Sequence, residues 1–252
     1  AEEMQKNREE FVKGASNKGV PIEKSGEIFD IMEKFASYGF NRSHAAAYSV
    51  VAFQTAYLKA HYPAEFMASV LTHNKNNLET IYFFLRECKR MNIPVLPPDV
   101  NESNINFTVN SKGAIRFGLS ALKNMGEGSG DDIINERKAN GPFASIFDLT
   151  SRVNLKAVNK KALEALVMGG GLDCFEGTHR AQYFAPTDRY ESLIEHAIRY
   201  GQSVQAQASQ TQLTLFGDSS TNMFQEPSLP QVPHWSLIEK LTREKEITGI
   251  YM

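Results

Sequence analysis

A glycine-containing turn between two helical patterns is the first stretch of the sequence that could do chemistry. Residues 119–137 read LSALKNMGEGSGDDIINER, in which an apolar residue is followed by Gly-x-Gly. This order between two helices is typical of a helix-hairpin-helix motif. Glycine leaves backbone N–H groups bare at a helix N-terminus, where they can bind a phosphate. The pattern predicts base-independent contacts to a nucleic-acid backbone from Met125, Gly126, Glu127, Gly128 and Ser129.

A second, more degenerate hairpin follows within residues 145–173. Ile146, Leu149 and Val153 form one helix face, NLKAVN is the turn, and Asn159 can cap the next helix. The predicted contacts to nucleic acid are Lys156, Asn159 and Lys160. A lone hairpin could be an ordinary connection between two helices. Two copies favour a DNA-binding unit, because one hairpin buries little surface and binds weakly.

Acidic and sulfur-containing residues could hold a metal, but their positions do not favour it. Asp131 and Asp132 would fall in a first helical turn, where carboxylates usually complement the helix dipole. Cys88 and Cys174 are far apart and have no paired metal-ligand spacing, so we expect both to be buried apolar residues. We therefore predict no metal site in this chain.

A polar and basic cluster stands near the start of another expected helix, in YGFNRSHAAAYS at residues 38–49. Ser43 is a plausible N-cap, so a guanidinium, a hydroxyl and an imidazole would gather at the positive end of one helix. The cluster consists of Arg42, Ser43 and His44. It predicts an anion-binding site, although Ser caps beside basic residues are also common without a ligand.

Residues 209–220, SQTQLTLFGDSS, place three large apolar side chains in a Gln- and Ser-rich context. Residues 202–234 contain no Lys or Arg and three prolines, which favours a linker or long loop. We interpret Leu213, Leu215 and Phe216 as part of a docking peptide. The alternative is that they pack back onto the protein's own surface.

The elements that must position these residues are mainly helical. Helical periodicity covers residues 1 to about 92, with Pro63 at the junction of two helices and a core-facing stripe on 78–88. INFTVN and AIRFGL, separated by SKG, predict a β-hairpin. Short helices are expected over 119–173 and 186–201, with a last helix near Trp235. The predicted stripe comprises Leu78, Ile81, Tyr82, Leu85 and Cys88.

Composition limits the classes of function. The 252 residues carry a net charge of −2, so the protein does not coat DNA by charge alone and any DNA contact must be local. No apolar run approaches the roughly 18 residues of a membrane span, and the polar start does not fit a secretory signal. These features predict a cytoplasmic protein without a membrane partner. The abrupt polar start and strand-like end are those expected of a piece of a longer protein.

Residues 27–72, EIFDIMEKFASYGFNRSHAAAYSVVAFQTAYLKAHYPAEFMASVLT, carry a resemblance to a known family. They are similar to the fingers region of the α subunit of bacterial DNA polymerase III, the C-family replicative polymerase. The resemblance is dense over 10–110, continues through GLSALKNMGEG and the second hairpin, and returns at LTREKEITGIYM. It implies a parent DNA-directed DNA polymerase whose palm domain holds the catalytic aspartates and magnesium. This chain lacks the palm and is expected to be inactive alone.

The same resemblance implies roles for the candidate sites. It places Arg42, Ser43 and His44 near the incoming deoxynucleoside triphosphate, and the hairpins on the primer–template duplex. The family carries an internal β-sliding-clamp-binding motif, which matches this sequence with Thr where Ser is usual. Other replicase subunits are further implied partners. The matching residues are Gln212, Leu213, Thr214, Leu215 and Phe216.

We therefore predict four regions. Residues 1–112 are part of the fingers, 113–201 a tandem helix-hairpin-helix region, 202–234 a linker with the clamp motif, and 235–252 a final helix leading into a further domain. The alternative is a non-catalytic DNA-binding adaptor of the repair type, which would not need the fingers-like block. An error-prone C-family paralogue is a third interpretation. The intact QLTLF sequence argues against it, because such paralogues generally lack a good clamp peptide.

Overall fold

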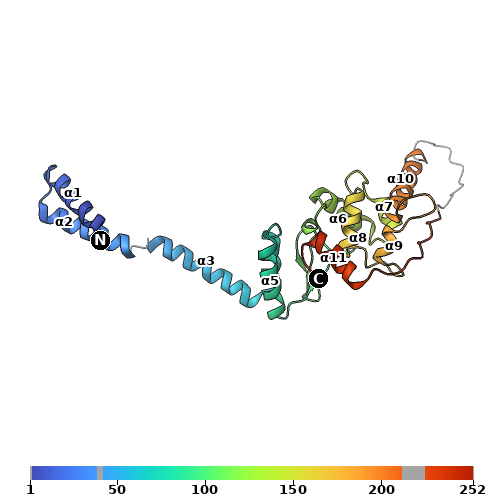
Figure 1. Cartoon of the computed structure of the whole chain (residues 1–252), viewed down its shortest axis with the longest axis horizontal. Helices are drawn as coiled ribbons and strands as arrows, with labels where there is room; N and C mark the ends of the chain where they lie inside the picture. Colours follow the sequence, from blue (N-terminus) through green and yellow to red (C-terminus); the bar gives the residue numbers. More distant parts are fainter. Residues whose placement is uncertain (1, 39–41, 212–224, 252) are drawn as a thin grey trace. The chain divides into compact units, whose positions relative to one another are not determined.

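The computed structural model describes residues 2–38, 42–211 and 225–251, and these are mainly helical (Figure 1). The chain divides into two compact units, Ala1–Ala60 and His61–Met252. The predicted hairpin region lies in the second unit, and the cluster at 42–44 lies in the first. The prediction of a mainly α fold is confirmed for the described residues.

The first unit contains α1 (Glu2–Ser16), α2 (Ile22–Tyr38) and all but the last residue of α3 (Arg42–His61). Helices α1 and α2 form an antiparallel pair whose turn includes Gly19 at φ +84°. The rings of Phe11 and Phe29 lie 5.6 Å apart between them. Arg8 Nε also lies 2.8 Å from Asp30 Oδ1, so apolar and ionic contacts both hold the pair.

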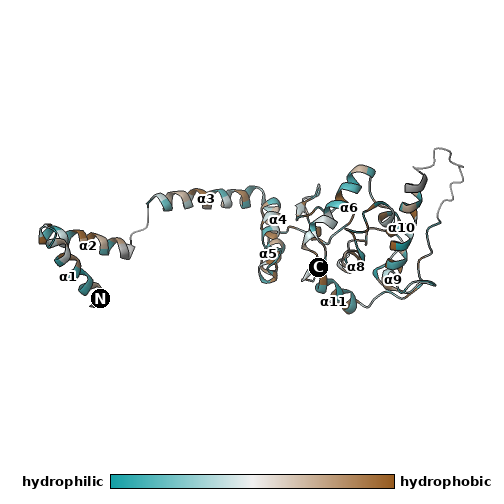
Figure 2. Cartoon of the chain, turned by 90° about the horizontal axis from the view of Figure 1, so that it is seen from above, coloured by the Kyte–Doolittle hydropathy of each residue, from teal (hydrophilic) through white to brown (hydrophobic). Residues whose placement is uncertain are grey.

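Helix α3 is apolar along much of its length, as Figure 2 shows, yet none of its residues is buried. The alanines on this helix leave close access to its backbone. The exposed large side chains are Tyr48, Val50, Val51, Phe53, Tyr57 and Leu58.

The second unit begins with α4 (Pro63–His73) and α5 (Leu78–Arg90). Pro63 occupies the first turn of α4, which confirms its predicted place at a helix junction. The stripe predicted on α5 is only partly core. Ile81 and Cys88 are buried, but Leu78 and Tyr82 are 51% and 37% exposed. The prediction was wrong for these two because periodicity gives a helix face, not how far the core extends along it.

The predicted β-hairpin is present as β2 (Thr108–Val109) and β3 (Ile115–Arg116), which pair antiparallel. Gly113 adopts φ +76° in its turn. A third strand, β1 (Val95–Leu96), was not predicted and pairs parallel with β3 in the order β1-β3-β2. Its pairing depends on residues about twenty positions away, which a local pattern does not reveal.

The rest of the second unit is helical and shares one hydrophobic core with α4, α5 and the sheet. The predicted boundary at 112/113 falls in the exposed turn between β2 and β3, whose strands both pack against this core. The remaining elements are η1 (Leu119–Ala121), α6 (Glu127–Asn140), α7 (Ile146–Arg152), α8 (Lys160–Gly169), α9 (Arg180–Phe184), α10 (Leu193–Thr211) and α11 (Leu237–Thr248).

Helix α10 departs from the sequence prediction at both ends. The helix expected over 186–201 begins at Leu193, and it continues through Thr211 into the predicted linker. Gly201 allows α10 to cross α7 closely, because a Cβ there would overlap the Thr150 carbonyl. Gln205 Nε2 then donates to the carbonyl oxygens of Thr150 and Val153, at 3.0 and 2.9 Å. These contacts with α7 extend the helix where composition favoured a loop.

Candidate nucleic-acid interface

The first candidate turn runs from η1 to the start of α6. The sharp bend is made by Asn124, at φ +68°, and not by the glycines. Gly126, the residue before α6, is extended at φ −73° and ψ 156° and contributes no side-chain cap. The two glycines are therefore not required by backbone strain, contrary to the expectation that they make the tight turn.

What the glycines provide is an open backbone surface. A Cβ built on Gly128 would meet no atom within 4 Å, and one on Gly126 would only touch Ser129 Oγ. The N–H groups of Gly126, Glu127 and Gly128 have no acceptor among the residues that the structure describes. Such bare N–H groups at the positive end of a helix can bind an anion.

The five predicted residues of this turn divide into two sets. Gly126, Glu127 and Gly128 are exposed. Met125 is 5% exposed and belongs to the hydrophobic core. Ser129 is 8% exposed, and its Oγ donates to the Ala157 carbonyl at 2.8 Å. The side chains of Met125 and Ser129 thus hold the turn in place.

Two lysines beside the first turn were not predicted from the sequence. Lys75 Nζ donates to Ser120 Oγ at 3.0 Å and lies 3.4 Å from Glu127 Oε1, so it partly neutralises this carboxylate. Lys123 is exposed, and its backbone N–H donates to the Ile247 carbonyl at 2.9 Å. Lys75 is distant in sequence, whereas Lys123 stands within the motif and its charge alone could have identified it.

The second candidate turn connects α7 to α8. The Asn154 carbonyl accepts the N–H groups of Ala157 and Val158, both at 2.9 Å. Asn159 caps α8 as predicted, because its Oδ1 accepts the Ala162 N–H at 3.2 Å. The predicted residues Lys156, Asn159 and Lys160 are all exposed.

Positive charge gathers at the start of α8. Lys161, which was not predicted from the sequence, is exposed there together with Lys156 and Lys160. Lys160 Nζ lies 3.9 Å from Glu195 Oε2 on α10, a weak surface pair that leaves its charge near solvent. The cations therefore supply a local positive surface in a chain whose net charge is −2.

The two turns are joined directly. Besides the bond from Ser129 to Ala157, the Asn154 N–H donates to Asp132 Oδ2 at 2.7 Å. Asp132 was expected only to complement the dipole of α6, and the structure gives it a bonding partner as well. The sequence predicted two separate hairpins, and the structure places their turns next to each other.

The cluster at 42–44 lies at the start of α3 in the first unit. The helix begins at Arg42, so Ser43 is its second residue and not the cap before it. Arg42, Ser43 and His44 are exposed, and the His44 ring lies 4.3 Å from the Tyr48 ring. The three predicted side chains therefore share the first turn of one helix.

The predicted clamp motif, Gln212–Phe216, lies outside the described residues. The residues on either side of it return to α7. Gln205, near the end of α10, is bonded to the last turn of α7, and Ser145 Oγ at the start of α7 donates to Glu226 Oε1 at 3.0 Å. One short helix thus anchors both flanks of the segment.

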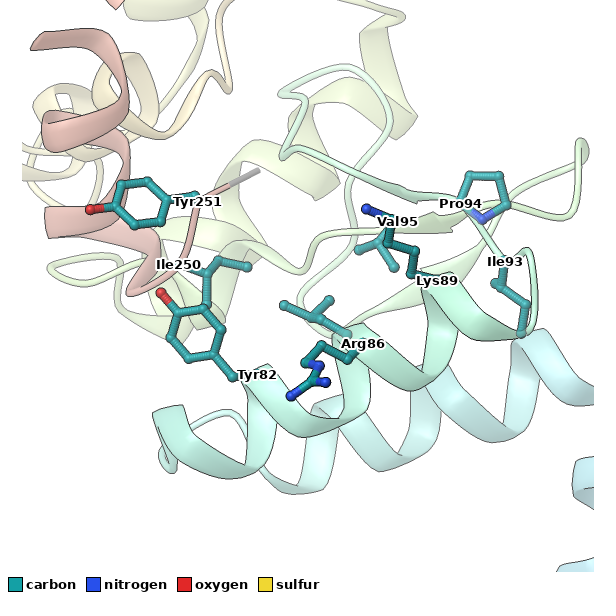
Figure 3. A pocket seen from close by; sticks show the side chains of 9 residues that line it. Tyr82, Arg86, Lys89, Ile93, Pro94, Val95, Ile250 and Tyr251 are labelled. Atoms are coloured by element: carbon teal, nitrogen blue, oxygen red, sulfur yellow. The ribbon is translucent and has the colours of Figure 1, made fainter. Parts of the chain in front are cut away.

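A separate apolar cavity of about 400 Å³ lies between α5, β1 and residues 250–251 (Figure 3). Tyr82 and Tyr251 stand at one end and Ile93, Pro94 and Val95 at the other. Arg86 and Lys89 line it from α5. No sequence pattern indicated this cavity, because its walls come from distant segments.

Metal, thiol and membrane features of the described residues add no further site. In the described ranges, no three His, Cys, Asp or Glu side chains gather in a way that could hold a metal ion. Both cysteines are free, and burial raises the pKa of the Cys88 thiol to about 11 and of the Cys174 thiol to about 12. Of the helices described, none has the length and apolar character to cross a bilayer.

Comparison with known proteins agrees with this geometry. A family model described as helix-hairpin-helix motif matches residues 92–183, which include both turns. The chain is 43% identical over 251 residues to the DNA polymerase III subunit alpha of Thermus aquaticus. It is 41% identical to that of Vibrio cholerae and 40% identical to that of Escherichia coli K12. Each match covers 100% of this chain.

The chain spans about a fifth of the length of these relatives, namely 19% for Thermus and 21% for the other two. Identity at this level along the whole chain exceeds what a shared motif alone would produce. Over its full length, the chain is homologous to a segment of DNA polymerase III α subunits, and it contains a helix-hairpin-helix motif.

Proposed function

We propose that this chain is the part of a replicative DNA-directed DNA polymerase that holds duplex DNA, helps to position the incoming nucleotide, and tethers the enzyme to the β sliding clamp. The observation that carries the proposal is the pair of joined turns, with bare N–H groups and exposed lysines, in a chain homologous throughout to polymerase III α subunits. We assign the magnesium-dependent joining of nucleotides to other parts of the parent protein.

The duplex would be held through its phosphates. The first turn offers N–H groups at the start of α6, and the second offers the start of α8 with Lys156 and Lys160. The amide oxygens of Asn154 and Asn159, which could otherwise help to read an adenine, accept the backbone N–H groups of Lys156 and Ala162. Binding should therefore depend on salt and ignore sequence.

The nucleotide would meet the first turn of α3. Arg42 supplies a permanent positive charge, and the Ser43 hydroxyl and His44 imidazole can hydrogen-bond to phosphate oxygens. All three are exposed at the helix end whose dipole favours an anion. This arrangement suits the triphosphate of a deoxynucleoside triphosphate.

The clamp would be reached by Gln212–Phe216. Leu213, Leu215 and Phe216 provide the apolar contacts, and α7 anchors the residues on both sides. A modest, micromolar-scale affinity is sufficient, because a polymerase already on DNA gains a second, intramolecular attachment. Other replicase subunits remain proposed partners of the parent.

The adaptor alternative uses the same DNA-binding turns and clamp peptide without a polymerase. The homology disfavours it, because the match extends over the residues before 92 as well as the hairpins. An adaptor would have no use for α3 and its exposed apolar surface.

Substituting Gly128 with alanine separates DNA binding from stability. Gly128 is helical and its Cβ position is empty, so G128A should leave the fold intact and raise the free energy of unfolding by about 0.5–1 kcal/mol. Affinity for a short duplex should nevertheless fall several-fold, because the methyl group keeps a phosphate from the backbone. Urea unfolding and fluorescence anisotropy measure the two quantities.

Gly14 in α1 provides the matched control. It is also helical with an empty Cβ position, but it lies in the other unit. G14A should stabilise its helix in the same way and leave DNA affinity unchanged. Equal duplex affinity of G128A and the unaltered chain would remove the first turn from the proposed interface.

A further inference from the structure

Two hydrogen bonds fasten the second candidate turn to the first turns of α6. We infer that Asp132 and Ser129 are positioning residues for duplex binding, which hold Lys156 and the start of α8 in register with the bare N–H groups of α6. The inference rests on the proposed DNA binding and adds that the two turns act as one site.

Asp132 fixes the beginning of the second turn. Its Oδ2 accepts the Asn154 N–H at 2.7 Å, and the Asn154 side chain accepts the Lys156 N–H at 3.0 Å. A continuous set of hydrogen bonds thus runs from α6 to the backbone of Lys156. The Lys156 side chain itself is exposed and is not used in this set.

Ser129 fixes the other end of the same turn. Its hydroxyl is buried and donates to the carbonyl of Ala157, two residues before the α8 cap Asn159. One bond at residue 154 and another at 157 restrict both the position and the tilt of the segment between them. A single contact would leave the segment able to rotate.

Because Asp132 is negatively charged, the direction in which its removal changes DNA affinity tests this role. A carboxylate near a phosphate-binding surface repels DNA, so removing it should strengthen binding if charge were its main effect. If Asp132 instead positions the turn, removing its acceptor oxygen should weaken binding. Asn keeps an acceptor oxygen without the charge, which separates the two effects.

Duplex affinity of the full chain, measured by anisotropy at fixed salt, is the first readout. We expect D132A to bind several-fold more weakly than the unaltered chain, and D132N to bind as well or better. The neighbouring, exposed Asp131 is the charge-matched control, and D131A should bind slightly more tightly. S129A, like D132A, should bind the duplex more weakly than the unaltered chain.

Coupling to Lys156 is the second readout, which a general loss of stability would not reproduce. In the unaltered chain, K156A should reduce the salt slope of log affinity by about 1. In the D132A background it should have little further effect, because Lys156 is no longer held at the duplex. Circular dichroism and thermal unfolding check that each variant is folded. If D132A does not fold, the same coupling to K156A is measured in the S129A background.

Three results would overturn the inference. D132A could bind as tightly as D132N, S129A could bind as the unaltered chain does, or K156A could have the same effect in both backgrounds. Each leaves the proposed function intact provided that the unaltered chain binds duplex DNA. If the unaltered chain does not bind at all, the proposed function itself fails.

Discussion

The double substitution L215A/F216A is expected to remove measurable binding to a bacterial β sliding clamp. Burying each of these side chains contributes about 1.5–3 kcal/mol, so losing both costs about 3–6 kcal/mol. A micromolar contact weakened by this amount, about 10²–10⁴-fold, falls beyond the range of calorimetric titration. Affinity for duplex DNA should not change, because the residues proposed to bind DNA do not include those of the motif.

The same segment contains a matched control. Met223 and Phe224 are also two adjacent large apolar residues, but they lie outside QLTLF. M223A/F224A removes comparable apolar surface and should keep clamp affinity within about twofold. Retained clamp binding by L215A/F216A, or equal loss in both variants, would show that the motif was assigned to the wrong residues.

Replacing Arg180 with methionine is expected to have the largest effect on stability. Arg180 is 6% exposed and lies 2.9 Å from Glu244 Oε2 and 2.6 Å from Asp173 Oδ2. Burial alone would lower the pKa of Arg180, but its hydrogen bonds and the charges of both carboxylates raise it. The guanidinium joins the start of α9 to α11, and its Nη1 also donates to the Met168 carbonyl.

R180M should lower the free energy of unfolding by about 3–5 kcal/mol, because it leaves Glu244 buried without its positive partner. Urea unfolding of the whole chain measures this loss. The double variant R180M/E244L also removes the unpaired charge of Glu244, so it should recover most of the lost free energy of unfolding. If R180M unfolds at the same urea concentration as the unaltered chain, the buried pair does not hold α9 and α11 together.

Local signals in the sequence predicted the local features of the fold. Pro63 starts α4, Asn159 caps α8, and the SKG turn joins β2 to β3, because each depends on a few neighbouring residues. Strand β1 depends on parallel pairing with β3, and the extra turns of α10 depend on contacts of Gly201 and Gln205 with α7. Neither can be derived without the tertiary structure.

The candidate site shows the same division. The Gly-x-Gly pattern located the bare N–H groups, and the Asn cap located the start of α8. The pattern could not tell that Ser129 and Asp132 bond to residues 157 and 154, or that Lys75 pairs with Glu127 from far earlier in the chain. These contacts decide which predicted residues face solvent and which hold the turns together.

The salt dependence of duplex DNA binding by this chain tests the central claim most directly. Anisotropy titrations between about 50 and 200 mM salt should give a linear fall of log affinity with log salt, at about −0.9 per phosphate neutralised. Two duplexes of unrelated sequence should give the same affinity. Affinity that is absent at low salt, or that is independent of salt, would contradict the claim that the joined turns hold DNA by its backbone.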